Sequence, residues 1–197
     1  FEDSPVDEIV IVCSADYIEY FRHSIIEKYG FKKVKAIVQG GKERYNSVYE
    51  GLKAAKGADY VLIHDGARPL VDNEIIVRSI HTVEKEKACV AGMPVKDTIK
   101  VSDEFGYSAN TPDRKSLWQI QTPQCFEYNL LARSYDKLFS DMSYGKSVPV
   151  ITDDAMIVEY GSDTKVKLIE GSYENIKVTT PEDMGIAELF LKKRRKM

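Results

Sequence analysis

The chain alternates short runs of apolar residues with longer stretches in which apolar residues recur at helical spacing. The apolar runs have the length and composition of strands that are buried on both faces. They lie at 8–13, 34–38, 60–63 and 88–93. The helical stretches lie at 16–29, which Gly30 follows as a C-cap residue, and at 46–55 and 72–87. This order of strands and helices predicts an α/β fold with a parallel sheet and crossover helices.

The pattern changes after Pro94, where short strand-like segments are separated by polar turns. These segments lie at 97–101, 106–111 and 116–121. They indicate a β-arm, residues 98–121, that is inserted into the α/β core. Beyond the arm, the sequence predicts two helices, two late strands and a final helix that begins at Pro181. The helices lie at 127–141 and at 153–159, with Thr152 as the N-cap, and the strands lie at 166–170 and 175–178.

Length and composition fit one globular domain, residues 1–197. The net charge of -3 provides no basic field for nucleic acid, and no apolar run is long enough to enter a membrane as a spanning helix. Cys13, Cys89 and Cys125 are far apart in apolar segments. We expect them to be the reduced core cysteines of a cytoplasmic protein.

A polar turn at 64–69 follows the apolar run 60–63 without a spacer. Ligands bind at the carboxyl ends of strands in open α/β sheets, so this turn delivers Asp65 and Arg68 to a binding edge. The carboxylate suits a hydroxyl or a metal, and the guanidinium suits a phosphate. A local ion pair that caps the next helix is the alternative interpretation.

A second candidate is the loop that contains Gly40 and Gly41, between a strand and a helix. Glycines in such a loop let backbone amides approach a planar or anionic ligand, and the helix start adds positive potential. Ser47, in the first turn, is placed to bond a ligand over the loop. The spacing is neither that of a dinucleotide fingerprint nor that of a P-loop, so an ordinary flexible loop is the alternative.

Four further residues are candidates of a weaker kind. Lys177 stands between apolar neighbours in the predicted strand 175–178, where a lysine usually lies at a sheet edge or reaches an anion. Arg114 lies in a polar turn of the arm, where most arginines are solvated. Thr98 follows Pro94 by four positions and Thr122 directly precedes Pro123, both in segments that could be ordinary turns.

No metal site is predicted. His23 and His81 lie on predicted helices without ligand spacing, so a metal centre at His64 and Asp65 is a poor interpretation. The acids at 153–154 fit a helix start, where they favour the helix dipole without a catalytic role.

Six segments together resemble the 2-C-methyl-D-erythritol 4-phosphate cytidylyltransferase family. They are GGKERYNSV at 40–48, HDGARP at 64–69, PVKDT at 94–98, QTPQ at 121–124, TDDA at 152–155 and EGSYENIKVTTPED at 170–183. Each segment is weak alone, but six in the order of the family, over nearly the whole chain, are specific. The resemblance implies a three-layer, Rossmann-like, glycosyltransferase-A-like nucleotidyltransferase with a mostly parallel sheet. It also implies a homodimer in which the arm of one subunit helps to build the site of the other.

The resemblance further implies the reaction of CTP with 2-C-methyl-D-erythritol 4-phosphate to give the CDP-alcohol and pyrophosphate, with Mg²⁺ held mainly by the CTP phosphates. Residues that match nucleotide-binding positions are Gly40, Gly41 and Ser47, with Asp65 and Arg68 at sugar and phosphate positions. Residues that match the methylerythritol phosphate pocket are Thr98, Arg114 and Thr122, with Lys177 and Arg114 as the catalytic pair that aligns the attacking phosphate.

One departure and two alternatives accompany this resemblance. Phe1 aligns past the first strand and glycine-rich CTP loop of the family, so we expect both to be missing from the chain as given. Ribitol-5-phosphate cytidylyltransferases share several of the segments, and PVKDT, TDDA and the approach to Gln121 favour the isoprenoid enzyme. The other alternative is a truncated, non-catalytic protein that dimerises and binds anions.

Overall fold

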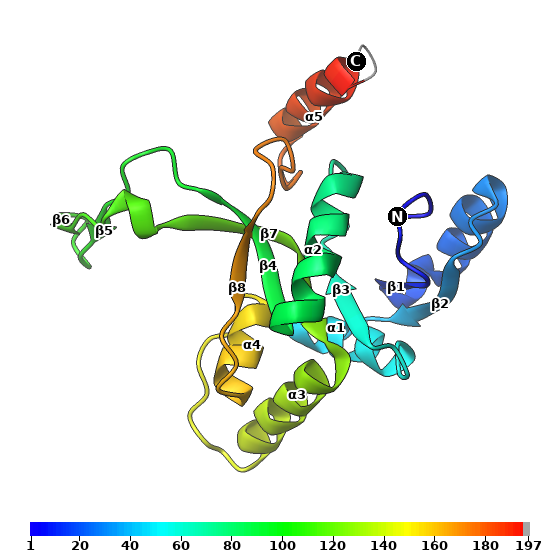
Figure 1. Cartoon of the computed structure of the whole chain (residues 1–197), viewed down its shortest axis with the longest axis horizontal. Helices are drawn as coiled ribbons and strands as arrows, with labels where there is room; N and C mark the ends of the chain where they lie inside the picture. The colour runs from blue at the N-terminus through cyan, green and yellow to red at the C-terminus, as the bar shows by residue number, and fades with distance from the viewer. Residues whose placement is uncertain (195–197) are drawn as a thin grey trace.

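The computed structural model describes residues 1–194, and its strands form two main sheets. The first is a parallel pair, β1 (Ile9–Cys13) and β2 (Val34–Gln39). The second has four strands in the order β3-β7-β4-β8 (Figure 1). Its strands are β3 (Tyr60–Ile63), β7 (Trp118–Glu127), β4 (Ala88–Pro94) and β8 (Lys167–Glu170). The apolar runs read from the sequence therefore form strands within one or two residues of their predicted bounds.

The four-stranded sheet is mixed, and the expectation of a mostly parallel sheet is wrong at β7. This strand is antiparallel to both of its neighbours, β3 and β4, whereas β4 and β8 are parallel. The arm explains the direction of β7. The chain leaves the sheet at the end of β4 and returns as β7, so β7 runs back beside β4 and separates it from β3.

Helices cover both faces of this sheet because successive strand residues point to opposite sides. On one face, α2 (Asn73–Glu86) buries Ile75 and Val83 against Cys89, Ala91 and Cys125. The other face carries α3 (Tyr128–Ser143) and α4 (Asp154–Gly161). Their core side chains pack on the alternate strand residues, and the cluster is formed by Ala88, Val90, Phe126, Leu131, Leu138, Ile157 and Val158.

The N-terminal region is joined to this core by α1 (Arg44–Ala54). This helix contacts β1 and β2 on one side and α3 on the other. The stretch predicted as one helix at 16–29 is instead a 3-10 turn, Ala15–Tyr17, followed by a π-helix, Tyr20–Glu27. Gly30 ends it in the left-handed region at φ 66°, as the C-cap prediction required.

The segment predicted as an arm projects from the body of the molecule (Figure 1). Its strands are shorter than predicted, since β5 (Val101–Ser102) and β6 (Ser108–Asn110) form only a small hairpin. A 3-10 turn, Arg114–Ser116, then leads into β7. At the tip, Phe105 and Tyr107 are 78% and 74% exposed, so the arm has no apolar core of its own.

Two predictions and one alternative interpretation for the second half of the chain are wrong in detail. The alternative of a turn at 122–124 is excluded because β7 runs through these residues, with a register irregularity near Pro123 where a strand tolerates proline. The segment 175–178 is no strand, since it is extended chain tied to the turn at 64–69 through Val178 N and Ala67 O, 2.7 Å apart. The N-cap of α4 is Asp153, whose carboxylate accepts from Met156 N at 3.0 Å, and not Thr152.

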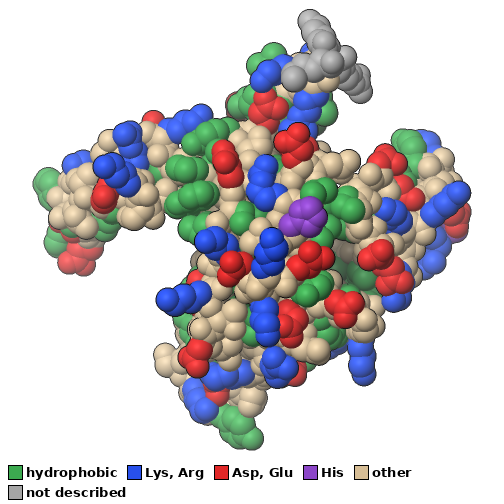
Figure 2. Space-filling view, in the orientation of Figure 1, with side chains coloured by type: hydrophobic (Ala, Val, Ile, Leu, Met, Phe, Trp, Pro, Cys, Tyr) green, Lys and Arg blue, Asp and Glu red, His purple; other side chains and the backbone are tan. Residues whose placement is uncertain are grey.

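The final helix is α5 (Pro181–Arg194), which begins at Pro181 as predicted. Figure 2 shows basic and acidic side chains interspersed over the visible face, in keeping with the small net charge. Cys13, Cys89 and Cys125 are free thiols. Within residues 1–194, no helix has both the length and the apolar character to cross a membrane.

The end of α3 is fastened to α4 by one carboxylate. Asp141 accepts hydrogen bonds from Lys137 at 2.9 Å, Lys146 at 2.5 Å and the hydroxyl of Tyr160 at 2.8 Å. The bonds from these side chains, that of Lys137 foremost, hold the pKa of Asp141 well below its usual range. The cluster therefore joins the loop after α3 to α4, which carries residues of the site described below.

We expect Asp141→Asn to lower the thermal unfolding midpoint at pH 7, because two lysines lose their anion. The folded-state pKa of Asp141 is depressed, so its contribution is complete above the unfolded pKa of about 4 and is lost as the pH falls below it. The difference from the unsubstituted protein should shrink in melts at acidic pH. Asp136→Asn is the control, since Asp136 accepts only an exposed bond from Tyr49. Equal losses for both variants at pH 7 would contradict this account.

Candidate functional site

A cavity of about 240 Å³ opens at the carboxyl end of β3. Its walls come from the turn after β3, the middle of β7, the start of α1, the start of α4 and the segment 175–178. The lining residues are Arg44, Asp65, Arg68, Ile120, Gln121, Thr122, Gln124, Thr152, Asp153 and Lys177. Three cations and two acids thus face a small space, which suits an anionic, hydroxyl-rich ligand better than an apolar one.

Asp65 is the centre of the charge arrangement. One of its carboxylate oxygens, Oδ2, lies 3.0 Å from Lys177 Nζ and 3.8 Å from Arg68 Nε. The other, Oδ1, accepts from Arg44 Nε at 3.2 Å. Burial raises the pKa of Asp65, but Lys177 and Arg44 outweigh it and hold the pKa below its usual value. The carboxylate is therefore ionised at neutral pH and shared between cations from three segments.

Arg44 is also bonded to a second acid that has no access to solvent. Its Nη1 lies 2.8 Å from Oδ2 of Asp154, and the hydroxyl of Tyr135 donates to Oδ1 of Asp154 at 2.9 Å. Burial raises the pKa of Asp154, and burial likewise raises that of Tyr135. The charge of Asp154 raises the pKa of Arg44 in spite of burial, so the guanidinium stays protonated.

Gln124 connects β7 to the start of α4. Its side-chain oxygen accepts from the backbone N–H groups of Asp154 at 2.9 Å and Ala155 at 3.1 Å. Its amide nitrogen donates to Asp153 at 3.1 Å. Two orphan N–H groups of the helix are satisfied in this way, so the helix start is fixed relative to the sheet.

A chain of hydrogen bonds orders the turn after β3. The backbone N–H of Asp65 donates to Thr122 Oγ1 at 3.1 Å, so the Thr122 hydroxyl is free to donate to His64 Nδ1 at 3.0 Å. The other ring nitrogen, Nε2, donates to the carbonyl of Arg68 at 2.9 Å, since a carbonyl only accepts. His64 is thus neutral with its proton on Nε2, and burial lowers its pKa.

The extended segment 175–178 carries Lys177 and also holds Arg68. Arg68 Nη1 donates to the backbone oxygen of Asn175 at 2.8 Å, and the side-chain amide of Asn175 donates to Thr122 O at 2.9 Å. Burial lowers the pKa of Arg68, while Asp65 raises it. Its Nε is buried and has no hydrogen-bond partner within residues 1–194, which leaves a donor for a ligand oxygen.

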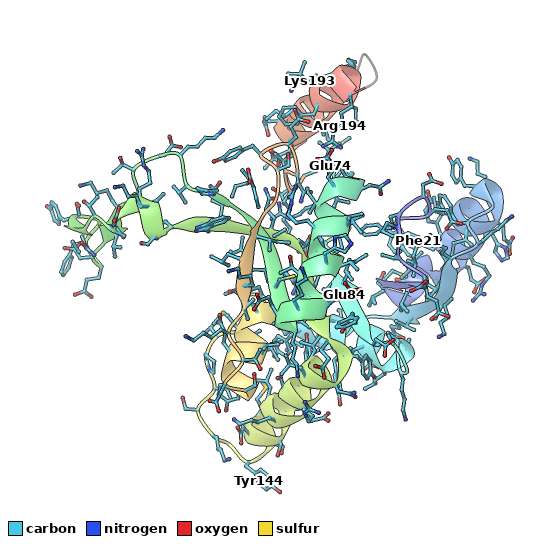
Figure 3. All side chains as sticks on the ribbon, in the orientation of Figure 1. Phe21, Glu74, Glu84, Tyr144, Lys193 and Arg194 are labelled. Carbon is cyan, nitrogen blue, oxygen red and sulfur yellow. The ribbon has the colours of Figure 1, made fainter. Side chains whose placement is uncertain are left out.

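Glu174, the residue directly before this segment, forms ion pairs with α5. Lys193 Nζ lies 2.8 Å from Glu174 Oε1, and Arg194 Nε lies 3.3 Å from Glu174 Oε2. Figure 3 labels Lys193 and Arg194 near the end of α5. The position of Lys177 therefore depends on a bridge to α5 as well as on Asp65.

The structure brings together four of the residues singled out from the sequence. Asp65, Arg68, Thr122 and Lys177 all line the cavity, although Lys177 lies on extended chain and not on a strand. Their roles toward a ligand stay predictions.

Gly40, Gly41 and Ser47 form the neighbouring loop between β2 and α1 and do not line the cavity. Ser47 Oγ accepts from Gly41 N at 3.1 Å, so the hydroxyl orders the loop itself. A Cβ on Gly41 would lie 2.4 Å from Asn46 Cβ, and one on Gly40 would lie 2.7 Å from Ser47 Oγ. Close packing, and not a positive φ, therefore demands glycine here.

Thr98 and Arg114 lie on the arm and do not line the cavity of their own chain. Both are exposed, and Arg114 Nη1 donates to the backbone oxygen of Lys96 at 2.8 Å. Within one chain, the structure does not join Arg114 to Lys177.

Sequence reasoning missed the second half of the charge arrangement. Asp153 and Asp154 were expected to favour only the helix dipole, yet Asp153 lines the cavity and Asp154 anchors Arg44. The sequence feature that could have indicated a buried acidic partner is Arg44, which follows the loop with Gly40 and Gly41.

Comparisons with known proteins agree with this geometry. The family model for 2-C-methyl-D-erythritol 4-phosphate cytidylyltransferase matches residues 1–193. The enzyme of that name from Lachnospira eligens is 49% identical over 193 residues, which are 98% of this chain and 83% of the relative. That from Alkaliphilus oremlandii is 50% identical over 191 residues, which are 96% of this chain and 78% of the relative.

A solved structure of a protein with a related name has the same fold. The 4-diphosphocytidyl-2C-methyl-D-erythritol synthase from Anaerococcus prevotii is 36% identical and superposes with a TM-score of 0.84, over 95% of this chain and 79% of that one. The fold is therefore that of a nucleotidyltransferase. The chain belongs to the 2-C-methyl-D-erythritol 4-phosphate cytidylyltransferase family.

The pKa of His64 should lie below the ordinary histidine value, because burial disfavours the charged ring. Protonation of His64 would also place a second donor opposite the Thr122 hydroxyl. Its neutral form therefore stabilises the fold fully above pH of about 6.5, and this contribution is lost as the pH falls. His23 is the internal control, since a bond to Glu27 raises its pKa. Ring signals followed by NMR over pH should show His64 titrating below His23. The reverse order would refute the proposed hydrogen-bond chain.

Proposed function

We propose that this protein transfers the cytidylyl group of CTP to 2-C-methyl-D-erythritol 4-phosphate, giving 4-diphosphocytidyl-2-C-methyl-D-erythritol and pyrophosphate. The observation that carries the proposal is the cavity in which Lys177, Arg68 and Arg44 surround Asp65. It lies in a chain that matches the family along nearly its whole length. The reaction supplies precursors for isoprenoids by the non-mevalonate route.

The chemistry asks the protein mainly for positioning and charge neutralisation. A phosphate oxygen of the alcohol substrate forms a bond to the α-phosphorus of CTP, and the bond from that phosphorus to the pyrophosphate breaks. Two anions must approach each other, so cations that hold both lower the barrier. Lys177 is suited to this role because its side chain is 45% exposed and pairs with Asp65. Its ammonium group would exchange this partner for the phosphate when the substrate binds.

The remaining cavity residues have roles that fit their places. Asp65 is a hydrogen-bond acceptor for sugar hydroxyls, and Arg68 offers its unpartnered Nε to a phosphate oxygen. Thr122 lines the wall beside Asp65 and receives the methylerythritol phosphate. The ordered loop of Gly40, Gly41 and Ser47 presents backbone groups to the cytosine.

Mg²⁺ belongs to the proposal as a companion of the CTP phosphates. Within residues 1–194, no group of three His, Cys, Asp or Glu side chains could hold a metal ion. Asp65 and Asp153, the acids of the cavity, already pair with Lys177 and Gln124. Mg²⁺ often binds through substrate phosphates and water, and when bound it would neutralise phosphate charge. CTP as substrate and three free thiols suit the cytoplasm.

The arm gives the reason to propose a homodimer. Thr98 and Arg114 stand outside the cavity of their own chain, on a projecting segment with exposed Phe105 and Tyr107. An arm that embraces a second subunit would bury these rings and deliver Arg114 to the cavity of that subunit. Arg114 and Lys177 would then hold the attacking phosphate from two sides.

The test of function is pyrophosphate release by the full-length protein from CTP, with methylerythritol phosphate and ribitol 5-phosphate in parallel reactions. We expect release with methylerythritol phosphate alone. Release with ribitol 5-phosphate alone would keep the mechanism but change the substrate. Release with neither, together with retained binding of CTP, would favour the non-catalytic alternative.

The dimer is tested by complementation. We expect Lys177→Ala and Arg114→Ala each to reduce turnover roughly 100- to 1000-fold, the loss typical of one transition-state cation or donor. CTP affinity should change much less for Lys177→Ala. Equal mixing of the two inactive variants should restore about a quarter of the full activity, because half of the dimers are mixed and each has one intact site. No recovery in a preparation shown to contain mixed dimers would place Arg114 and Lys177 in the same chain's site.

A further inference from the structure

We propose that Arg44 is a positioning residue for the reaction, and that Asp154 and Tyr135 hold it in place. This proposal rests on the proposed function. Arg44 binds one oxygen of Asp65, so that the carboxylate does not neutralise the charge of Lys177 completely. Arg44 need not touch either substrate. Arg44 sets how strongly Asp65 attracts Lys177 before the phosphate binds.

The first step is the division of Asp65 between its partners. Arg44 occupies Oδ1 with two nitrogens, Nε at 3.2 Å and Nη2 at 3.2 Å. Lys177 occupies Oδ2 at 3.0 Å. A carboxylate that is held at both oxygens is fixed in rotation and shares its charge, so neither cation is fully neutralised by it. Lys177 therefore keeps attraction for an incoming phosphate.

The second step is the anchor of Arg44 itself. An arginine whose side chain is 36% exposed could swing away from Asp65, but its Nη1 lies 2.8 Å from Asp154. Asp154 has no exposed surface. The hydroxyl of Tyr135 donates to its carboxylate, and its backbone N–H donates to the side-chain oxygen of Gln124, which together fix its orientation. Breaking the pair would leave a buried charge without a partner, which is strongly unfavourable. The far end of Arg44 is therefore immobile.

The third step is the consequence for the reaction. Without Arg44, Asp65 is free to rotate and to pair with both Lys177 and Arg68, whose Nε lies at 3.8 Å. Both phosphate-binding cations would then be drawn to the carboxylate. The loss should appear in turnover and in the KM for the phosphorylated alcohol more than in the overall stability of the fold.

Arg44→Lys is the variant of choice, because lysine keeps one charge but cannot bridge two carboxylates with a planar fork. We expect kcat to fall roughly 10- to 100-fold, the cost of misplacing a group in a site. Tyr135→Phe keeps the buried ring and removes one anchor bond, so its loss should be smaller and in the same direction. A double-mutant cycle gives the decisive readout. In an Asp65→Asn background, Arg44→Lys should change kcat little further, because the acid through which it acts is gone.

The matched control is Tyr49→Phe. Tyr49 stacks on Tyr135 with ring centroids 5.4 Å apart, and its hydroxyl donates to Asp136 at 2.9 Å, away from the cavity. The kcat of Tyr49→Phe should stay within about twofold of that of the unsubstituted protein, because the variant loses only a hydrogen bond at the surface. Equal kcat losses for Tyr49→Phe and Tyr135→Phe, or fully additive losses for Arg44→Lys and Asp65→Asn, would overturn the positioning role. Absence of pyrophosphate release by the unsubstituted protein would instead refute the proposed function.

Discussion

The site depends on one constraint, which is that a largely buried carboxylate must be surrounded by cations. Asp65 is only 15% exposed, and an ionised group at that depth is stable only when it is paired. Its partners come from the start of α1, the turn after β3 and the segment before α5. The pairing therefore draws three distant parts of the chain to one point, and the same cations are then in place for a phosphate.

Strand β7 is the structural support for this arrangement. One short stretch of it presents Ile120, Thr122 and Gln124 to the cavity. Thr122 orders the turn after β3 through His64, while Gln124 fixes the start of α4. Because β7 returns from the arm between β3 and β4, one continuous strand runs from the arm to the wall of the cavity. The insertion that reverses one strand of the sheet is thus also the element that connects the arm to the site.

The charge balance of the cavity is consistent with the anion binding that we propose. Arg44 is occupied by Asp154 and shares Asp65 with Lys177 and Arg68. Each of these cations has a carboxylate partner, yet Arg68 keeps a buried Nε without a hydrogen-bond partner in the described chain. On the proposed function, a phosphate would compete with Asp65 for Lys177 and would leave the buried pair of Arg44 and Asp154 intact.

Local sequence patterns determined the strands at 60–63 and 88–93, the C-cap at Gly30 and the helix start at Pro181, because each depends on residues within a few positions. The resemblance of the six segments to the family supplied the candidates at the site. The tertiary structure alone decided which acids are buried. A helix start with Asp153 and Asp154 has the same sequence whether it faces water or the core. Asp154 can be buried because Arg44, 110 positions away, and Gln124, 30 positions away, bond to it there. Interactions over such separations depend on how the sheet and helices pack, and no local pattern records them.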